Sequence, residues 1–328
     1  MSPDDIQKVM SYSLTGLTYS FSLPFLYIVA FKSPPSMSVY RNTILNLAIW
    51  YCITMASYAV LFQPIYAVHM GKSCARFVGL ASYFGAEVNV GVMFLSAISL
   101  ENTAISILIC FLCRLEQVRS TNKLSLMESY KGVFVCIALH IAVSIFAGCI
   151  CYAILVFSEL IEDTGTYLLC FDDRSYYMVK ALVLLVAIAF IVGTVVFSGF
   201  AFITIKVLAS HKALMTKSTY RLQRLLTINL IIILILPIVF DIIPICTLCY
   251  MIYVKSNSLY FWVLFADHAP FGDVIFTFLA TLLFVTPYRE AVKALLRITS
   301  AAKVTDIIVA PANRKISTKA ISFVISEA

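Results

Sequence analysis

Charged residues are scarce in this sequence. They account for 12% of its 328 residues, whereas hydrophobic residues account for 61%. An ordinary soluble domain averages about 25% charged residues. The mean hydropathy of the chain is +0.95. These values exclude an ordinary soluble domain and predict an integral membrane protein.

The sequence also lacks the motifs of several chemistries. No zinc-ligand spacing, Gly-rich phosphate loop or Ser-His-Asp pattern is found. Phe240-Asp241 and Gly272-Asp273 superficially resemble the paired aspartates of intramembrane proteases, but Pro270 breaks the expected Gly-x-Gly-Asp form. We therefore predict a protein that is not an enzyme and that needs neither a metal nor a cofactor.

Seven apolar segments are long enough to cross a bilayer. Each covers roughly 20 to 28 residues, which suits a hydrocarbon core of about 30 Å. We therefore predict an all-α integral membrane protein, a seven-transmembrane helix bundle without a strand-rich domain. The predicted spans are 10–31, 43–66, 86–113, 132–157, 180–205, 225–253 and 260–284.

Basic residues are distributed unevenly between the two sides of these spans. With the N-terminus outside, the inner segments hold eighteen of the 24 Lys and Arg residues. The positive-inside rule therefore predicts an outside N-terminus. The same bias explains the net charge of +7 without nucleic-acid binding. We predict an extracellular N-terminus (1–9), a transmembrane domain with a surface helix (10–297) and a cytoplasmic tail (298–328).

The third span carries polar side chains on one face. At 100° per residue, six of them fall within an arc of about 140°. In lipid, such side chains are tolerated only where they face other helices or a water-filled cavity. We therefore expect the third span to be the central helix. The polar seam consists of Asn89, Ser96, Ser99, Asn102, Thr103 and Ser106.

Two of the ten cysteines fall in the predicted outer loops. Cys74 and Cys170 face an oxidising compartment in which a disulfide would persist. Two unpaired thiols remain the alternative, because the distance between them cannot be seen in the sequence. The other cysteines lie within spans or at their inner ends, where they serve most simply as small packing residues.

Prolines and ionisable side chains mark the sixth and seventh spans. Pro237 and Pro244 each remove a backbone hydrogen bond, so we predict a kink and a hinge on either side of Asp241. Asp267 and His268 lie near the outer end of span seven. Ionisable groups at membrane depth are functional candidates because leaving them unpaired is costly.

Two inner segments are basic. The stretch Lys206–Arg224 holds five basic residues and no acidic one, so it would face anionic lipid or an acidic partner. A role in membrane topology alone would also explain it. After span seven, Val292 and Leu295 mark one face of a helix and Lys293 another, which predicts a short amphipathic helix on the membrane surface.

Several segments together resemble those of a G-protein-coupled receptor (GPCR). Seven spans, an outside N-terminus, a pair of outer-loop cysteines and Arg114 at the inner end of span three carry this resemblance. The finer resemblance is to nematode serpentine chemoreceptors of the Str superfamily, with class d (Srd) preferred and class h (Srh) next. It rests on Ser38–Asn46, Gln63-Pro64, Lys72–Gly79, Ser106–Arg114, Leu222–Leu226 and Pro287–Arg289.

Two motifs of rhodopsin-like receptors are replaced in this chain. Cys113-Arg114-Leu115 stands where those receptors have Asp-Arg-Tyr, and Val285–Arg289 stands in place of Asn-Pro-x-x-Tyr. Arg114 therefore has no adjacent carboxylate. It either pairs with a residue elsewhere in the chain or extends toward lipid phosphate.

The resemblance implies a chemosensory receptor. Such a receptor would bind a small odorant or pheromone-like ligand in the outer half of the bundle and activate a heterotrimeric G protein. It would be a multi-pass plasma-membrane protein, expected in the sensory cilium of a chemosensory neuron. A transporter or channel is the alternative, although no inverted repeat is visible. Candidate ligand residues are Asn89, Ser96, Asp241, Asp267 and His268, and candidate coupling residues are Arg114, Arg221, Arg224 and Arg289.

Overall fold

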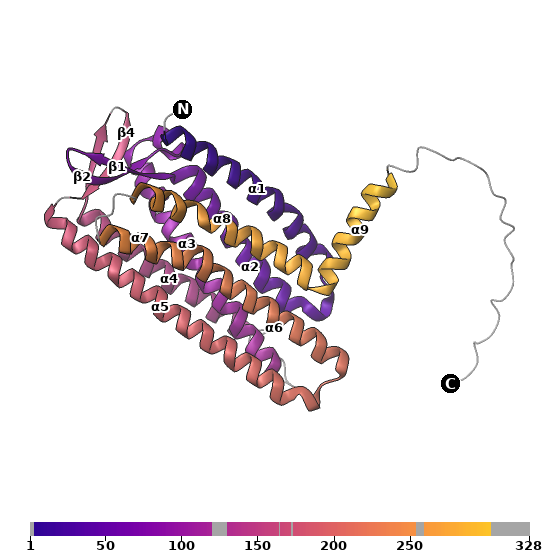
Figure 1. Ribbon diagram of the computed structural model, residues 1–328. Coiled ribbons are helices and arrows are strands. Elements are labelled where there is room, and N and C mark those ends of the chain that lie inside the picture. Colours follow the sequence, from indigo (N-terminus) through magenta and orange to yellow (C-terminus); the bar gives the residue numbers. More distant parts are fainter. Residues whose placement is uncertain (1–2, 120–129, 164, 172, 254–258, 303–328) are drawn as a thin grey trace, which may run out of the picture.

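The computed structural model describes residues 3–119, 130–163, 165–171, 173–253 and 259–302. Seven of its helices are long and apolar enough to cross a membrane, which confirms the predicted seven-helix bundle (Figure 1). The spans are α1 (Pro3–Lys32), α2 (Ser38–Met55) with the π-helical segment η2 (Ala56–Phe62), α3 (Ala86–Arg119), α4 (Tyr130–Val156), α5 (Asp173–Ser210), α6 (Lys217–Pro237) continued by the π-helical segment η6 (Ile238–Ile242) and α7 (Ile243–Tyr253), and α8 (Leu259–Phe284).

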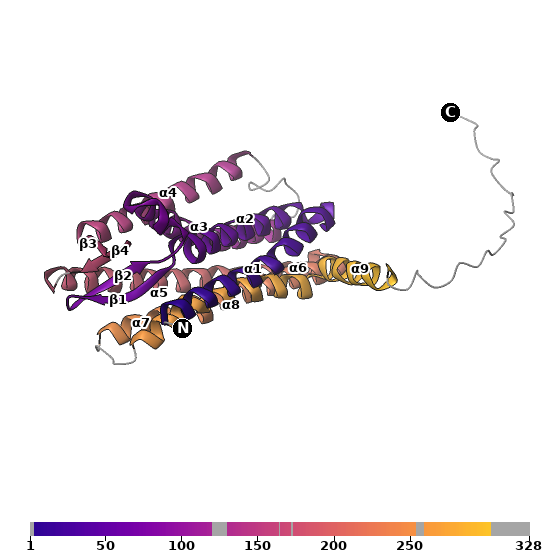
Figure 2. The ribbon, with the colours of Figure 1, turned by 90° about the horizontal axis from the view of Figure 1, so that it is seen from above.

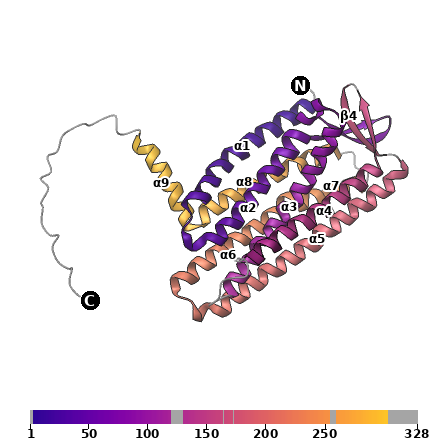
Figure 3. The ribbon, with the colours of Figure 1, turned by 180° about the vertical axis from the view of Figure 1, so that it is seen from behind.

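Helix α3 is the central helix, as its polar seam predicts. It packs on α2, α4, α5 and α6, and all six seam residues are buried. Figure 3 shows α3 between α2 and α4. The seam is used for contacts between helices: Asn102 Nδ2 donates to Ser144 Oγ of α4 at 2.9 Å, and Asn46 Nδ2 of α2 donates to Ser106 Oγ at 2.9 Å. Such hydrogen bonds hold helices together in lipid.

A four-stranded antiparallel sheet caps the end of the bundle at which the N-terminus lies (Figure 1). The sequence reasoning predicted no strands. Helical structure in span two ends at Phe62, because Gln63 adopts a positive φ of 40° and a strand begins at Pro64. The predicted span 43–66 is therefore too long by four residues. The strands are β1 (Pro64–His69), β2 (Lys72–Phe77), β3 (Glu159–Asp163) and β4 (Thr166–Phe171), in the order β1-β2-β4-β3.

Glycines allow a tight turn and a close passage of the chain at this end of the bundle. Met70 and Gly71 connect β1 to β2 with φ values of 49° and 79°, as a tight two-residue hairpin turn requires. After β2, the chain passes so close to the end of span two that a Cβ at Gly79 would lie 2.2 Å from the Leu61 carbonyl oxygen. Only glycine fits there. The segment η3 (Leu80–Phe84) then leads into α3.

The opposite end of the bundle is closed by side chains and by a further helix. The largest buried apolar cluster joins α1, α2, α3, α6 and α8 with the start of α9 (Thr286–Ala302). Val292 and Leu295 pack against this cluster, whereas Arg289 and Lys293 are exposed. This confirms the predicted amphipathic helix, although the remainder of the predicted tail, 303–328, lies outside the described residues. Figure 2 shows α9 beyond the helices, away from the sheet. We call the two extremities the sheet end and the α9 end.

Candidate functional site

A cavity of about 210 Å³ lies near the middle of the bundle. Its walls come from α3, α4, α5, α6, η6, α7 and α8, together with Tyr51 of α2. Most of the lining side chains are aliphatic or aromatic, and a few polar groups converge among them. This combination is typical of sites for small molecules.

Two carboxyl groups, from spans six and seven, face this cavity together. Tyr51 Oη donates to Asp273 Oδ2 at 2.6 Å, and Thr277 Oγ1 donates to Asp273 Oδ1 at 3.3 Å. Asp241, on η6, also lines the cavity and interacts electrostatically with Asp273. Asp241 Oδ1 is buried and accepts no hydrogen bond from the described residues. Because a buried polar atom without a partner is costly, Asp241 is the group that a bound donor would stabilise most.

A third acidic side chain reaches the same cavity. Glu101 of α3 is half-buried and lines the cavity. None of the described residues that line the cavity is Lys, Arg or His. The polar part of the site is therefore acidic.

The local sequence explains why Asp241 and Asp273 approach each other. Pro237 cannot donate a backbone hydrogen bond, and the five residues that follow it form the π-helical segment η6. On the facing helix, a Cβ at Gly272 would lie 2.7 Å from the Phe240 ring. The absence of that Cβ lets the ring pack against α8, which brings the neighbouring aspartates to one cavity. The kink predicted at Pro237 and Pro244 is thus a π-helical segment between the two prolines.

An apolar cluster joins the sheet to the helices beneath it. Phe77 of β2 and Leu169 of β4 pack with Phe62, Met93 and Cys151. Met93 lies seven residues before Leu100, a lining residue, which corresponds to about 10 Å along the helix. The sheet and this cluster therefore lie above the cavity, on the side of the N-terminus.

The cavity also reaches the outer flank of the bundle. Leu100, Phe146 and Leu185 line it, and their side chains are 41%, 49% and 57% exposed. They belong to α3, α4 and α5. In a bilayer this flank would face lipid, so the cavity is accessible from the side.

One of the five predicted ligand residues, Asp241, lines this cavity, and the other four lie elsewhere. Asn89 is fully buried and donates to the Gly85 carbonyl at 2.9 Å. Ser96 donates to the Val92 carbonyl at 2.9 Å. Both side chains lie closer to the sheet end, and their hydrogen bonds stabilise α3 and the segment leading into it.

Asp267 and His268 lie together, but beside α1. Gln7 Nε2 and Tyr58 Oη donate to the Asp267 carboxylate at 3.1 and 2.8 Å. His268 Nδ1 lies 2.8 Å from a carbonyl one turn earlier in α8 and donates to it, so in the neutral ring Nε2 accepts from Ser11 Oγ at 3.2 Å. The neighbouring void measures about 10 Å³. These contacts join α1 and η2 to α8 and leave no room there for an organic ligand.

Three residues of the cavity were missed by sequence reasoning. Glu101 and Asp273 carry the same signal as Asp241, an ionisable group at membrane depth, and that signal alone could have identified them. Tyr51 gave no signal, because one tyrosine in an apolar span is usually a packing residue. Its role depends on its hydrogen bond to Asp273, which only the folded chain reveals.

Arg114 is buried at the α9 end and joins α3 to α6. Its side chain is 2% exposed. Nη2 donates to the Gln223 carbonyl at 2.5 Å, Nε to Thr227 Oγ1 at 3.4 Å, and Nη1 to Gln117 Oε1 at 3.3 Å. Of the two alternatives left open by the sequence, the structure places Arg114 against another helix and away from lipid. All three acceptors are uncharged, so the buried guanidinium charge is only partly compensated.

The other candidate coupling residues are accessible. Arg221 and Arg224 are exposed on the first turns of α6, and Arg289 is exposed at the start of α9. Beside Arg289, Tyr288 is buried, and its hydroxyl lies 2.9 Å from Ser33 Oγ at the end of α1. Burial raises the pKa of Tyr288, so this contact is between neutral hydroxyl groups.

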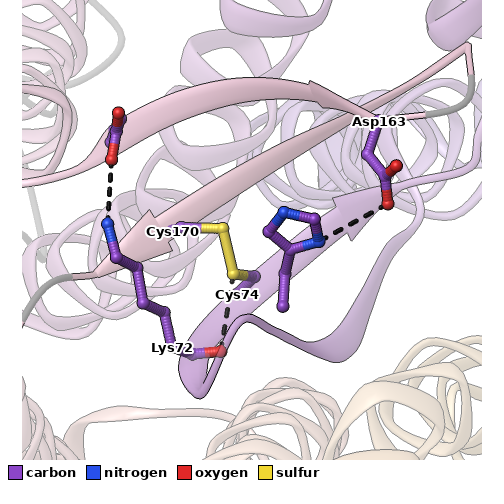
Figure 4. Close-up of a disulfide and its surroundings, with 6 residues drawn as sticks. Lys72, Cys74, Asp163 and Cys170 are labelled. Carbon is purple, nitrogen blue, oxygen red and sulfur yellow. Dashed lines mark hydrogen bonds and ion pairs between the residues drawn. A yellow bond between two sulfur atoms is a disulfide. The ribbon is translucent and has the colours of Figure 1, made fainter.

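The expected cysteine pair forms a disulfide within the sheet. Cys74 of β2 and Cys170 of β4 are directly opposite in the register and are joined by a bond that closes 96 residues of chain (Figure 4). Beside it, Lys72 Nζ lies 3.0 Å from Glu159 Oε2, and His69 Nδ1 lies 3.5 Å from Asp163 Oδ2. The bridge and these contacts link the two hairpins to each other.

The arrangement of helices matches a solved receptor structure. Squid rhodopsin superimposes on the chain with a TM-score of 0.60, covering 91% of this chain and 87% of that chain at 12% sequence identity. At that identity, the likeness concerns the fold alone. The seven-helix bundle therefore has the GPCR fold, and its seven apolar helices make the chain a multi-pass membrane protein.

The sequence assigns a family within this class. The family model described as serpentine type 7TM GPCR chemoreceptor Srh matches residues 2–298. The chain belongs to this family. The resemblance seen in the sequence favoured class d over class h. The family model that matches is that of class h, and the preference for class d is not confirmed. A search of curated proteins returned no match.

Proposed function

We propose that this chain is a chemosensory receptor that binds a small ligand in the central cavity and activates a heterotrimeric G protein at the α9 end. The observation that carries the proposal is the position of span six. At its middle, Pro237 and Asp241 line the cavity. At its far end, Gln223 and Thr227 are bound by Arg114. A ligand that favours a different bend at η6 would shift the equilibrium of contacts at the α9 end.

The proposed orientation places the sheet end outside the cell. The distribution of basic residues supports it, because the inner segments then hold eighteen of the 24 Lys and Arg. A disulfide on the sheet side is also consistent with an oxidising exterior. In this orientation, residues 1–9 are extracellular, 10–297 form the membrane domain with its surface helix, and 298–328 are cytoplasmic. The plasma membrane, and within it a sensory cilium, is the proposed location.

The proposed docking surface is formed by the starts of α6 and α9. Arg221, Arg224 and Arg289 are exposed there, and the segment Lys206–Arg224 contains no acidic residue. Such a rim would attract an acidic partner surface. Arg114 is buried in this conformation and would become accessible when α6 separates from α3. Separation would relieve the cost of holding its charge among uncharged acceptors.

The experiment that tests this function measures calcium or cAMP responses to an odorant panel in cells that express the chain. A ligand-evoked response is expected in wild type. Arg221→Ala combined with Arg224→Ala should abolish the response and leave surface expression and ligand binding intact. The control is Lys32→Ala combined with Lys131→Ala, which removes two exposed charges at the same end from α1 and α4.

Two outcomes would contradict the proposal. Equal dose dependence in the Arg221/Arg224 variant and in wild type would contradict the proposed docking surface. The basic segment would then be explained by membrane topology alone. Ligand uptake into the cell without a second-messenger response would favour the alternative of a transporter.

A further inference from the structure

We propose that the central cavity binds a small organic ammonium ion, with Asp241 as the group that holds its positive charge. The proposal rests on the proposed function in one respect, that the cavity is where a ligand binds. It adds the chemical class of that ligand. Binding can be measured on the purified protein without a G protein, so the two proposals can fail separately.

Charge balance in the cavity points to a cation. Glu101, Asp241 and Asp273 reach it from three different spans, and no described lining residue is basic. A carboxyl group in apolar surroundings is neutralised by a proton or by a cation. Among the described residues, no three His, Cys, Asp or Glu side chains are grouped so that they could hold a metal ion. The walls are mostly apolar, which suits an organic body better than a hydrated inorganic ion.

The hydrogen bonds distinguish the two aspartates. Both oxygens of Asp273 already accept hydrogen bonds, from Tyr51 and Thr277. Asp241 Oδ1 has no partner in the described part of the chain. An ammonium group can donate up to three hydrogen bonds, so Asp241 is its direct partner. Asp273, fixed by Tyr51, contributes negative potential nearby.

The dimensions of the cavity limit the ligand to a small molecule. An apolar cavity of about 150 Å³ binds benzene, which has six carbon atoms. The volume of about 210 Å³ found here therefore suits about eight to ten non-hydrogen atoms. 2-Phenylethylamine has this size, with an aromatic body for the apolar walls and an ammonium group for Asp241. Its neutral counterpart of nearly the same shape is 2-phenylethanol.

The route into the cavity suits an amphiphilic amine. Leu100, Phe146 and Leu185 line the cavity and are exposed on the flank of the bundle. Amines with an apolar body concentrate at the membrane surface, because their apolar part is removed from water. From there they reach the flank laterally.

The test compares the two probes on purified full-length receptor by thermal unfolding. A ligand that binds only the folded state raises the unfolding temperature with concentration. We expect 2-phenylethylamine to stabilise wild type and 2-phenylethanol to stabilise it much less. Asp241→Asn should weaken the apparent affinity for the amine about 10- to 100-fold, as expected for loss of a charged hydrogen bond. Glu87→Gln is the control, because it removes an exposed carboxylate of α3 outside the cavity.

Equal stabilisation of wild type by the amine and the alcohol would overturn the proposal, because the carboxyls would then be neutralised by protons. This comparison needs no variant and so remains decisive even if Asp241→Asn does not fold. Stabilisation by sodium chloride in place of the amine would also overturn it. Amine stabilisation without signalling would contradict the proposed receptor function alone, whereas odorant signalling without amine stabilisation would contradict this inference alone.

Discussion

The two ends of the bundle are held together by different kinds of bond. At the sheet end, four paired strands and the Cys74–Cys170 disulfide join the connections between spans. At the α9 end, the contacts are non-covalent: the largest buried apolar cluster joins α6 and α9 to α1, α2, α3 and α8, and hydrogen bonds run from Arg114 to α6 and from Asn229 to Tyr40 and Thr281. Each such bond contributes about 1 kcal/mol. The difference indicates that helices at the α9 end can separate without breaking a covalent bond, whereas the disulfide ties the connections at the sheet end together.

The cavity lies between these two ends and touches the span that crosses from one to the other. Span six changes from α-helix to π-helix at Ile238–Ile242, beside the cavity. Above this point, the disulfide-linked sheet limits movement of the bundle. Below it, α6 is held by non-covalent contacts, those of Arg114 and those of the apolar cluster. A ligand that binds in the cavity can therefore change the positions of helices mainly at the α9 end.

The largest effect is expected from breaking the sheet end. Cys74→Ser opens the disulfide, which closes 96 residues and is worth roughly 4 to 5 kcal/mol on the chain-entropy model. Surface expression and the unfolding temperature should both fall strongly. Cys52→Ser is the control, because Cys52 is a half-buried free thiol in α2. Peptide mapping of unreduced protein that found Cys74 and Cys170 as free thiols would contradict this prediction.

A smaller effect is expected at the level of the cavity. Gly272→Ala places a Cβ 2.7 Å from the Phe240 ring, which is also stacked on Phe276. Overpacking of this kind costs about 1 to 3 kcal/mol. The unfolding temperature should fall, and the affinity of cavity ligands should change because Asp241 adjoins Phe240. Gly148→Ala, in α4, has open space around the new Cβ and should be neutral. Equal behaviour of the two variants would show that η6 and α8 are not in close contact.

The smallest effect is expected from one hydrogen bond at the α9 end. Thr227→Val removes the hydroxyl that accepts from Arg114 Nε and keeps the shape of the side chain. A loss of about 0.5 to 1.5 kcal/mol corresponds to a change of roughly 2- to 10-fold in the equilibrium between attached and separated α6. Basal second-messenger levels should therefore rise. Thr204→Val is the control, since the buried Thr204 hydroxyl bonds within its own helix. An unchanged basal level would mean that Arg114 does not restrain α6.

Most of the helical architecture could be predicted from the sequence. The length and apolarity of each span gave seven helices, and the seam from Asn89 to Ser106 identified the central one because polar groups in lipid must face protein. The amphipathic pattern after Thr286 gave α9. The sheet could not be predicted in the same way. Its strands are five or six residues long, and their pairing depends on contacts between hairpins that are far apart in the sequence.

The candidate site could be predicted only in part. Asp241, Asp267 and His268 were equal candidates in the sequence, because each is an ionisable side chain within a predicted span. Their positions could not show which carboxylates already have hydrogen-bond partners. Asp267 is satisfied by Gln7 and Tyr58, from two other helices. Asp241 lines the cavity, and its Oδ1 lacks a partner in the described chain. That difference depends on contacts between side chains of different helices, and the polar and apolar periodicity of the sequence does not reveal such contacts.

The most direct test of the account measures two distances in one receptor preparation by spin labelling, with the exposed Cys149 replaced by Ser. One label pair is placed at Arg119→Cys and Lys217→Cys, at the α9 ends of α3 and α6; the other is placed at Leu80→Cys and Leu160→Cys, at the sheet end. All four positions are exposed. On adding the ligand with the strongest response in the odorant panel, the first distance should lengthen and the second should stay unchanged. An unchanged first distance, or equal changes at both ends, would contradict the account.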